Sequence, residues 1–453
     1  MYSQSVATGA ADSTKCFSNA IQAPGNRCGG GDAINGSYCQ SSTITPALVY
    51  IPPGKYRVTS SIVMWYATQI VGDAANPPTI YVDPTYTPGI GLSVFDADIY
   101  IPSGSGAEWY ANQNNFFRQL RNVIIDMTQA PLDASGIHWQ VAQATSLQNV
   151  YINMRNKTQR DNKQQGIFAE NGSGGFMSDV FITGGAIGAT LGSQQFTTRN
   201  LQITGSATAI SMVFDWVWLF QNLVIRDCDV GIDMTSGGFT NQAIGSVVVV
   251  DSTISATQGI LTPYTPGYSS PQTGGTLMLE NVDFTGSKQA IAPAAGVNSR
   301  TVLAGGQFVK LFAQGNAWTT AGNALNGQLP NGQQCSLPGT NGTSPNTLTA
   351  TEITIQRQLA PVPRPASLVD ANGRWYVRSK PQYAITPLSG ISSALAAGLK
   401  GDGQSGKLPE SHRATILTTL QTTQLRCKHL SIPAPPLVIS ATSTKVPISS
   451  RPR

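Results

Sequence analysis

Polar side chains of the kind that bind sugars recur at two fixed distances after isoleucines in the middle of the chain. One set lies three positions after an isoleucine and the other six, and the members are Gln140 and Glu170, then Gln143, Ser173 and Trp216. Amides and hydroxyls both donate and accept hydrogen bonds, and an aromatic face can cover a sugar ring. We therefore expect a carbohydrate-binding surface; the alternative is that these side chains are merely solvated or bond to one another between strands.

Catalytic groups are scarce. Glycoside hydrolysis needs two carboxyl groups, or one acid and a positioned water, in a cleft. Of only five glutamates, Glu170 alone falls in the polar sets, and Glu280 adjoins an expected ladder asparagine and is interpreted as structural. The only histidines are His138, His412 and His429, so neither a metal cluster nor a catalytic histidine network is expected, and His138 is interpreted as a packed ring. We predict no metal and no cofactor.

One stretch imitates a nucleotide site. Gly401, Gly406 and Lys407 have the spacing of a phosphate-binding P-loop. Such a loop needs a buried strand before it and a Ser or Thr after the lysine, but here Leu408 and Pro409 follow. We therefore predict no nucleotide binding.

The elements that position the polar residues form a repeat. A polar leader precedes alternating apolar positions in five segments, with leaders Asn149, Asp179, Asn200, Asn222 and Asn281. Upstream of most of them lies an isoleucine after a small residue, and these are Ile137, Ile167, Ile187, Ile210 and Ile232. The distance from the isoleucine to the apolar residue after the leader is 13 or 14 residues, and the isoleucines are 20 to 30 apart.

A near-constant inner spacing with a coil-length period is typical of a parallel β-helix, in which each coil buries its apolar residues against the coils above and below. The leaders would then stack into a hydrogen-bonded ladder. Segments 48–58 and 120–127 extend the pattern upstream, and 301–312 extends it downstream. An ordinary β-sandwich is the alternative, but sandwich strands do not usually keep such an internal register.

We expect three regions. Residues 1–325 form the β-helix, and residues 326–383, rich in Gly, Pro, Asn, Ser and Thr at their start, form an inter-domain segment. Residues 384–453 lack the pattern and are expected to be an irregular, disordered tail. The fold class is therefore all-β, a single-stranded β-helix with an irregular C-terminal tail.

Composition limits the partners. The chain has 453 residues, 11% of them charged, and its formal net charge of +5 is diffuse, which argues against nucleic acid. No apolar run has membrane-spanning length, and no signal peptide is visible. A Cys28–Cys39 bridge is plausible, and four glycosylation sequons, at Asn35, Asn156, Asn171 and Asn341, would fit a secreted protein.

Several motifs resemble a known family. The segments "GIHWQVAQATSLQNV", "QGIFAENGSGGFMSDV", "GSQQFTTRNL" and "VGIDMTSGG" look like the first β-helix of the fungal family 55 glycoside hydrolases, the exo-β-1,3-glucanases. The likeness runs from Asn26 to about Arg378. The broader fold is that of the pectate lyase superfamily, a right-handed parallel β-helix.

The resemblance implies an extracellular enzyme with two tandem β-helices that releases terminal glucose from β-1,3-glucan with inversion, and we expect a monomer. A glutamate of the second helix is the general acid, and the first helix binds sugar and positions the attacking water. The residues carried over are Gln143 and Ser173 for the water, with Gln140, Glu170, Gln194 and Trp216 for the sugar.

The sequence departs from the family at both ends. The family's "YGAKGDGxTDDT"-like opening is replaced here by "VATGAADSTKCFSNAI", and after "RSKPQY" a second such opening is cut short at "KGDG". We therefore expect a chain truncated or altered there, without the general acid and with little or no activity of its own.

Two further hypotheses remain. The chain could be a non-catalytic β-helix that binds a polysaccharide. A pectin lyase or a polygalacturonase-like enzyme is less favoured, because the sequence has no Asp-Asp pair, no Gly-His-Gly and no aspartate cluster for calcium.

Overall fold

The computed structural model describes residues 8–23, 41, 46–235, 243–264, 274–294, 301–320 and 350–375. The Cys28–Cys39 pair, the sequons at Asn35 and Asn341, the P-loop-like stretch and the expected tail 384–453 lie outside the described residues. Everything described belongs to one compact unit, Met1–Ala384.

The described part of this unit consists mostly of β-strands, with one α-helix. Its elements are β1 (Thr8–Asp12), α1 (Thr14–Ile21), β2 (Ala47–Ile51), β3 (Lys55–Val58), β4 (Ile62–Val63), β5 (Thr68–Gly72), β6 (Thr79–Val82), β7 (Phe95–Asp96), η2 (Asn112–Asn114), β8 (Gln119–Asp126), β9 (Ser135–His138), β10 (Ser146–Asn153), β11 (Gln165–Ala169), β12 (Phe176–Thr183), β13 (Ile187–Thr204), β14 (Thr208–Gln221), β15 (Val224–Asp233), β16 (Ser246–Thr262), β17 (Thr276–Asp283), β18 (Gln289–Pro293), β19 (Leu303–Ala304), β20 (Phe308–Thr320), β21 (Ala350–Gln358) and η3 (Ala366–Leu368).

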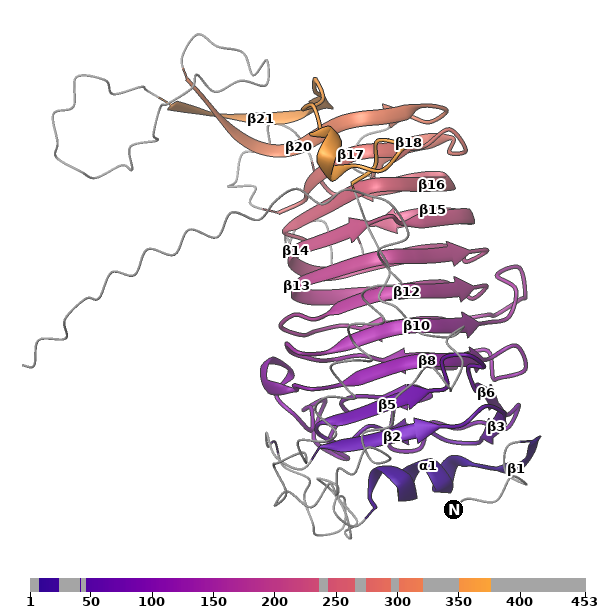
Figure 1. The fold of residues 1–453 in the computed structure, drawn as a ribbon. Coiled ribbons are helices and arrows are strands. Elements are labelled where there is room, and N and C mark those ends of the chain that lie inside the picture. The colour runs from indigo at the N-terminus through magenta and orange to yellow at the C-terminus, as the bar shows by residue number, and fades with distance from the viewer. Residues whose placement is uncertain are drawn as a thin grey trace, which may run out of the picture. The chain divides into compact units, whose positions relative to one another are not determined.

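The strands stack as the parallel β-helix that the sequence predicts (Figure 1). β8, β10, β12 and β13 pair in parallel and in register, so that Val123, Val150, Val180 and Leu201 form one column of fully buried side chains. Because each side chain lies over its equivalent in the next coil, apolar positions at a constant spacing build a continuous core.

Each of these strands bends at its polar leader. The leaders adopt left-handed backbone angles, with φ between 51° and 60°, at Asn122, Asn149, Asp179, Asn200, Asn222, Asp251 and Asn281. Asn and Asp tolerate this conformation better than other residues with a Cβ. Their side chains bond between coils, for example Asn200 Nδ2 to Asp179 Oδ1 at 2.9 Å and Asn222 Nδ2 to Asn200 Oδ1 at 2.6 Å. The predicted ladder is confirmed.

The isoleucine column lies on a second stack of parallel strands, which forms another side of the β-helix. Ile137 pairs with Ile167, and Ile210 pairs with Ile232 and then, through it, with Ile260. The expected place of Ile187 in this column is wrong. Ile167 and Ile210 both pair with Ala189, and Ile187 pairs with Gln165. A shift of two residues keeps the same face inward, so the hydrophobic pattern alone could not distinguish the two registers.

The two ends of the β-helix differ. Helix α1 lies at the N-terminal end, where it buries Phe17 and Ile21 (Figure 1). At the other end β20 pairs antiparallel with β17, and β21 pairs antiparallel with β20. The expectation that segment 301–312 adds another parallel coil is therefore wrong. Its strand runs antiparallel to the last one. Of the predicted inter-domain segment 326–383, residues 350–375 are described, and they include β21.

Near its C-terminal end the ladder includes a buried ion pair. Asp251 is 2% exposed and accepts a hydrogen bond of 2.6 Å from Arg364 Nη1, and Arg364 Nε also donates to Glu280 at 2.8 Å. The Trp375 backbone N–H donates to the second oxygen of Asp251. Glu280 thus takes part in an ion pair that ties residue 364 to β17, which agrees with its interpretation as structural.

Asn200→Ala is expected to lower the free energy of unfolding by about 1–3 kcal/mol, because it removes two ladder hydrogen bonds and places alanine at a φ of 51°. Asn200→Gly is the matched control, since it removes the same bonds but tolerates the backbone angle. Urea denaturation of both variants separates the two contributions; equal losses would mean that the backbone angle contributes nothing.

Candidate active site

A groove of about 240 Å³ lies at the corner between the isoleucine wall and the strands that lead to the ladder. Its lining residues are Gln143, Ser173, Gly174, Gly175, Gln195, Phe196, Thr197, Val217 and Leu219. The predicted neighbours on adjacent coils, Gln143 and Ser173, meet here: Ser173 Oγ donates to Gln143 Oε1 at 3.3 Å. Two uncharged groups that each donate and accept hydrogen bonds thus face one small hollow.

The groove is shaped by glycine and aromatic residues. Gly175 has a φ of 130°, and a Cβ there would lie 2.6 Å from Thr145 Oγ1 and 2.9 Å from the Phe196 ring. Only glycine therefore lets Phe196 form the groove wall. Phe196 stacks on Trp218 with ring centroids 4.6 Å apart, and Trp218 is fully buried. The wall is consequently rigid and apolar beside the polar Gln143–Ser173 pair.

Trp216 and Gln194 do not line the groove themselves, but each is next in sequence to a residue that does. Trp216 is 61% exposed, and Val217, the next residue, lines the groove. Ser193 pairs with Asp215 and Gln195 with Val217, so Gln194 lies beside Trp216 on the neighbouring coil. Gln194 is half-buried. Contact of these two residues with a sugar stays a prediction.

Asp215 lies just below this surface and is 2% exposed. One of its oxygens accepts hydrogen bonds from the backbone N–H groups of Gly245 and Ser246, at 2.7 and 3.0 Å. Burial outweighs these bonds and raises the pKa of Asp215 to about 6. Asp215 is not among the groove-lining residues, so the geometry gives it no direct contact with a ligand.

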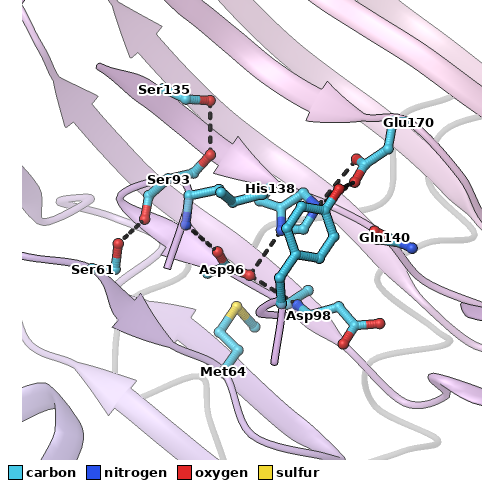
Figure 2. A network of polar contacts seen from close by, with 12 residues as sticks. Ser61, Met64, Ser93, Asp96, Asp98, Ser135, His138, Gln140 and Glu170 are labelled. Atoms are coloured by element: carbon cyan, nitrogen blue, oxygen red, sulfur yellow. Dashed lines mark hydrogen bonds and ion pairs between the residues drawn. The ribbon is translucent and has the colours of Figure 1, made fainter. Parts of the chain in front are cut away.

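A second polar cluster, the Asp96–His138–Glu170 network, crosses three coils (Figure 2). His138 is fully buried, and its Nδ1 lies 2.9 Å from Asp96 Oδ1 while its Nε2 lies 3.0 Å from Glu170 Oε1. Asp96 pairs with His138 across β7 and β9, which puts the two side chains in one column. Tyr100 donates its hydroxyl to Glu170 Oε1 at 2.6 Å.

Charges in this network stabilise one another. Burial disfavours the charged imidazolium of His138, but Asp96 and Glu170 outweigh it and raise the pKa to about 10. Burial would raise the pKa of Glu170, yet the hydrogen bonds and charge of His138, with the hydroxyl of Tyr100, lower it below its usual value. The network therefore favours the charged imidazolium of His138 and the ionised form of Glu170.

Gln140 was predicted to contact sugar, and its place in the fold argues against direct contact. Its residue is 0% exposed, and neither atom of its side-chain amide has a hydrogen-bond partner in the described part of the chain. It lies beside the His138–Glu170 pair in Figure 2. Asp98, close by, is also buried, and burial raises its pKa to about 8.

Sequence reasoning missed the role of His138. The ring does pack, stacking on Phe168 with centroids 5.5 Å apart, but it also bridges two carboxylates. The signal available in the sequence was Glu170, because His138 and Glu170 follow Ile137 and Ile167 closely on coils that the repeat makes neighbours. Two further properties concern only the described residues: no group of three or more His, Cys, Asp or Glu side chains could hold a metal ion, and no helix is long and apolar enough to cross a membrane.

The profile of a pectate-lyase-like family, described as rhamnogalacturonase A/epimerase, matches residues 4–233. The chain belongs to this pectate-lyase-like family. The match covers half of the chain and agrees with the parallel β-helix. A probable glucan endo-1,3-beta-glucosidase of Arthroderma benhamiae is 39% identical over 88% of this chain and 51% of its own length. A glucan 1,3-beta-glucosidase of Cochliobolus carbonum is 36% identical over 87% of this chain and 45% of its own.

A third relative carries a different name. The non-secreted LysM effector LysM19 of Penicillium expansum is 37% identical over 87% of this chain and 28% of its own length. The chain described here thus spans about half, or less, of the length of each of these three relatives. The predicted resemblance to glucan 1,3-β-glucosidases is confirmed at 36–39% identity.

Proposed function

We propose that this chain is the glucan-binding and water-positioning β-helix of a glucan 1,3-β-glucosidase. The observation that carries the proposal is the Gln143–Ser173 hydrogen bond inside a groove lined by Phe196, with the exposed Trp216 next in sequence to the groove-lining Val217. A neutral amide and a hydroxyl can together hold one water, and an aromatic face suits a sugar ring. Glucosidases among the relatives support the choice of substrate.

Inverting hydrolysis explains why such a pair is useful. One carboxyl protonates the leaving oxygen, while a water attacks from the opposite face of the sugar. In our proposal Gln143 and Ser173 hold that water, and terminal glucose is released from the chain end. No described residue that lines the groove carries a carboxyl group, and Glu170 is held ionised. We therefore propose that the general acid comes from outside the described residues, and that the protein acts as a monomer outside the cell.

The second candidate is a β-helix that binds β-1,3-glucan without cleaving it. The absence of a proton donor among the described groove residues favours this candidate for the chain on its own. General acid–base catalysis contributes roughly 10²–10⁴-fold to such reactions. Without that contribution, turnover of a natural glucan is expected to be small.

The test is a laminarin assay on one preparation of the whole chain, with binding followed by calorimetry and released glucose measured enzymatically. We expect binding with little or no glucose release. Failure to bind laminarin at all contradicts both candidates. Strong glucose release abolished by Glu170→Gln would overturn the proposal that the acid lies elsewhere.

Trp216→Ala is expected to weaken laminarin binding about tenfold, because a ring that is 61% exposed loses its contact with the sugar. The matched control is Leu48→Ala, which removes a side chain that is 68% exposed on β2, on a different coil. Equal affinities for the wild type and Trp216→Ala would remove Trp216 from the binding surface.

A further inference from the structure

Two of the N-x-S/T sequons lie in the described part of the chain, and they start at Asn156 and Asn171. This tripeptide is the signal for attachment of an oligosaccharide to the asparagine amide, which adds a bulky hydrophilic group. A folded chain can carry such a group only where the asparagine is at the surface and its amide nitrogen is not engaged in the fold. The surroundings of the two sequons therefore decide which of them suits modification.

The sequon at Asn156 lies on the surface. Asn156 and Thr158 are both exposed, in the loop between β10 and β11. The Oδ1 atom of Asn156 accepts hydrogen bonds from the backbone N–H and from the hydroxyl of Thr158, at 2.9 and 3.0 Å. The amide nitrogen, which would take the sugar, donates to no residue that the structure describes. The acceptor group is thus free of the fold.

The chain is fastened to the β-helix on both sides of Asn156. Arg155 Nε donates to the backbone carbonyl of Ala130 at 2.8 Å. Lys157 Nζ lies 2.7 Å from Asp229 Oδ1, and the Lys157 side chain is only 21% exposed. Because the residues before and after it are tied to neighbouring coils, Asn156 is presented at a fixed place on the surface.

The sequon at Asn171 has different surroundings. Asn171 is half-buried between β11 and β12. Ser173, whose hydroxyl completes this sequon, is 2% exposed, and that hydroxyl donates to Gln143 in the groove at 3.3 Å. A transferase that reads the sequon needs the hydroxyl residue as well as the asparagine. In the folded chain this second sequon is therefore embedded in the candidate active site.

The loop that carries Asn156 lies at a different corner of the β-helix from the groove. The groove-lining Gln143 precedes β10, whereas loop 154–164 follows it, and β10 bends between them at Asn149. No described residue of loop 154–164 lines the groove. A glycan on Asn156 would therefore leave the groove open.

We propose that Asn156 is an N-glycosylation site and that Asn171 stays unmodified in the folded protein. The proposal rests on the proposed location outside the cell but not on glucan binding. The donor is an oligosaccharide joined to a lipid through pyrophosphate. Asn156 Nδ2 forms a bond to the anomeric carbon, the bond from that carbon to the phosphate oxygen breaks, the lipid pyrophosphate leaves with the electron pair, and one amide proton is released.

The test is expression of the whole chain behind a cleavable secretion signal in a eukaryotic host, followed by peptide mapping. An endoglycosidase trims each glycan to one N-acetylglucosamine on the asparagine. Chymotrypsin then separates the two sequons, because cleavage after Tyr151, Phe168 and Phe176 gives the peptides 152–168 and 169–176. We expect the added sugar on most copies of 152–168 and on almost no secreted copy of 169–176. An unmodified peptide 152–168, in both the secreted and the cell-retained chain, overturns the proposal.

Three variants identify the modified amide. Asn156→Gln and Thr158→Val each destroy the sequon, so both should abolish the added mass on peptide 152–168. Thr158→Ser is the matched control, because it keeps the hydroxyl and should keep the modification. The same peptide contains Asn153 and Asn162, which lie outside any sequon. Added mass that survives in Asn156→Gln would place the glycan on one of these and contradict the assignment.

Access in the folded state has its own assay, which uses the unglycosylated chain, a soluble sequon-specific N-glucosyltransferase and UDP-glucose. The isolated peptides 152–168 and 169–176 give the preference of the enzyme itself. In the folded chain the preference for Asn156 over Asn171 should be at least about tenfold greater than in the peptides, because exposure of Ser173 requires local opening. An equal preference in both would show that the fold does not choose between the sequons.

Laminarin calorimetry separates this inference from the proposed function. The glycosylated chain and Asn156→Gln should bind laminarin with the same affinity, because the loop lies away from the groove. Weaker binding by the glycosylated chain, restored in Asn156→Gln, would contradict that placement of the glycan. If the chain is glycosylated at Asn156 but neither form binds laminarin, the proposed function fails and the glycosylation site stands.

Discussion

His138→Leu is expected to destabilise the β-helix by about 3–5 kcal/mol, the loss typical when one partner of a buried ion pair is removed. The leucine leaves the carboxylate of Asp96 buried at 0% exposure without its partner at 2.9 Å. Two backbone N–H groups, those of Leu92 and Asp98, still donate to Asp96, and they limit the loss. The measurement is urea denaturation at pH 7.

The matched control is Phe168→Leu. This change removes the ring that stacks on His138 but leaves both ion pairs in place. A half-buried aromatic contact is worth about 0.5–1.5 kcal/mol beyond its area. If the two variants lose the same stability, His138 acts through packing alone and the ion pairs contribute little.

The pH dependence of the free energy of unfolding tests the same ion pairs independently. The pKa of His138 is about 10 in the folded chain, above its ordinary value of about 6.5. A raised pKa means that the folded state binds the proton more tightly, so this stabilisation is complete below about pH 6.5 and is lost as the pH rises to about 10. The wild type should therefore lose stability between pH 7 and 10, and His138→Leu should not show this component.

Much of the fold follows from the sequence because each coil repeats the same physical problem. A leader that tolerates a left-handed φ, followed by alternating apolar residues, recurs at Asn149, Asp179 and Asn200, and a single register satisfies all of them. The contact between Gln143 and Ser173 was predictable for the same reason. Their coils have the same inner spacing of 13 residues, so equal offsets from Ile137 and Ile167 lead to neighbouring positions.

The rest could not be predicted because it depends on the register between coils that lack the pattern. Asp96 and Tyr100 lie on a coil without a leader of the usual kind, and only the pairing of β7 with β9 places Asp96 against His138. Ile187 was misplaced because alternation has a period of two and cannot detect a shift of two. The antiparallel β20 was misread because the hydrophobic pattern of a strand carries no direction.

Ser173→Ala and Gln143→Ala are each expected to slow the hydrolysis of 2,4-dinitrophenyl β-glucoside by about 10²-fold, at the lower end of general acid–base effects. This substrate has a leaving group so acidic that it departs without protonation. The chain can therefore be assayed without a general acid, and the rate reports only how well the attacking water is held. The Ser173–Gln143 hydrogen bond of 3.3 Å makes the two residues one unit.

The effects of residues that act as a unit are not additive. The rate of the double variant should therefore be at most about twofold lower than the rate of either single variant. Gln202→Ala is the control, because Gln202 lies beyond the ladder in β13 and does not line the groove. Its rate should match the wild type when dinitrophenolate release is followed by absorbance. Two independent losses that multiply in the double variant would mean that Gln143 and Ser173 do not hold the same water, and the proposed mechanism would then need a different nucleophile site.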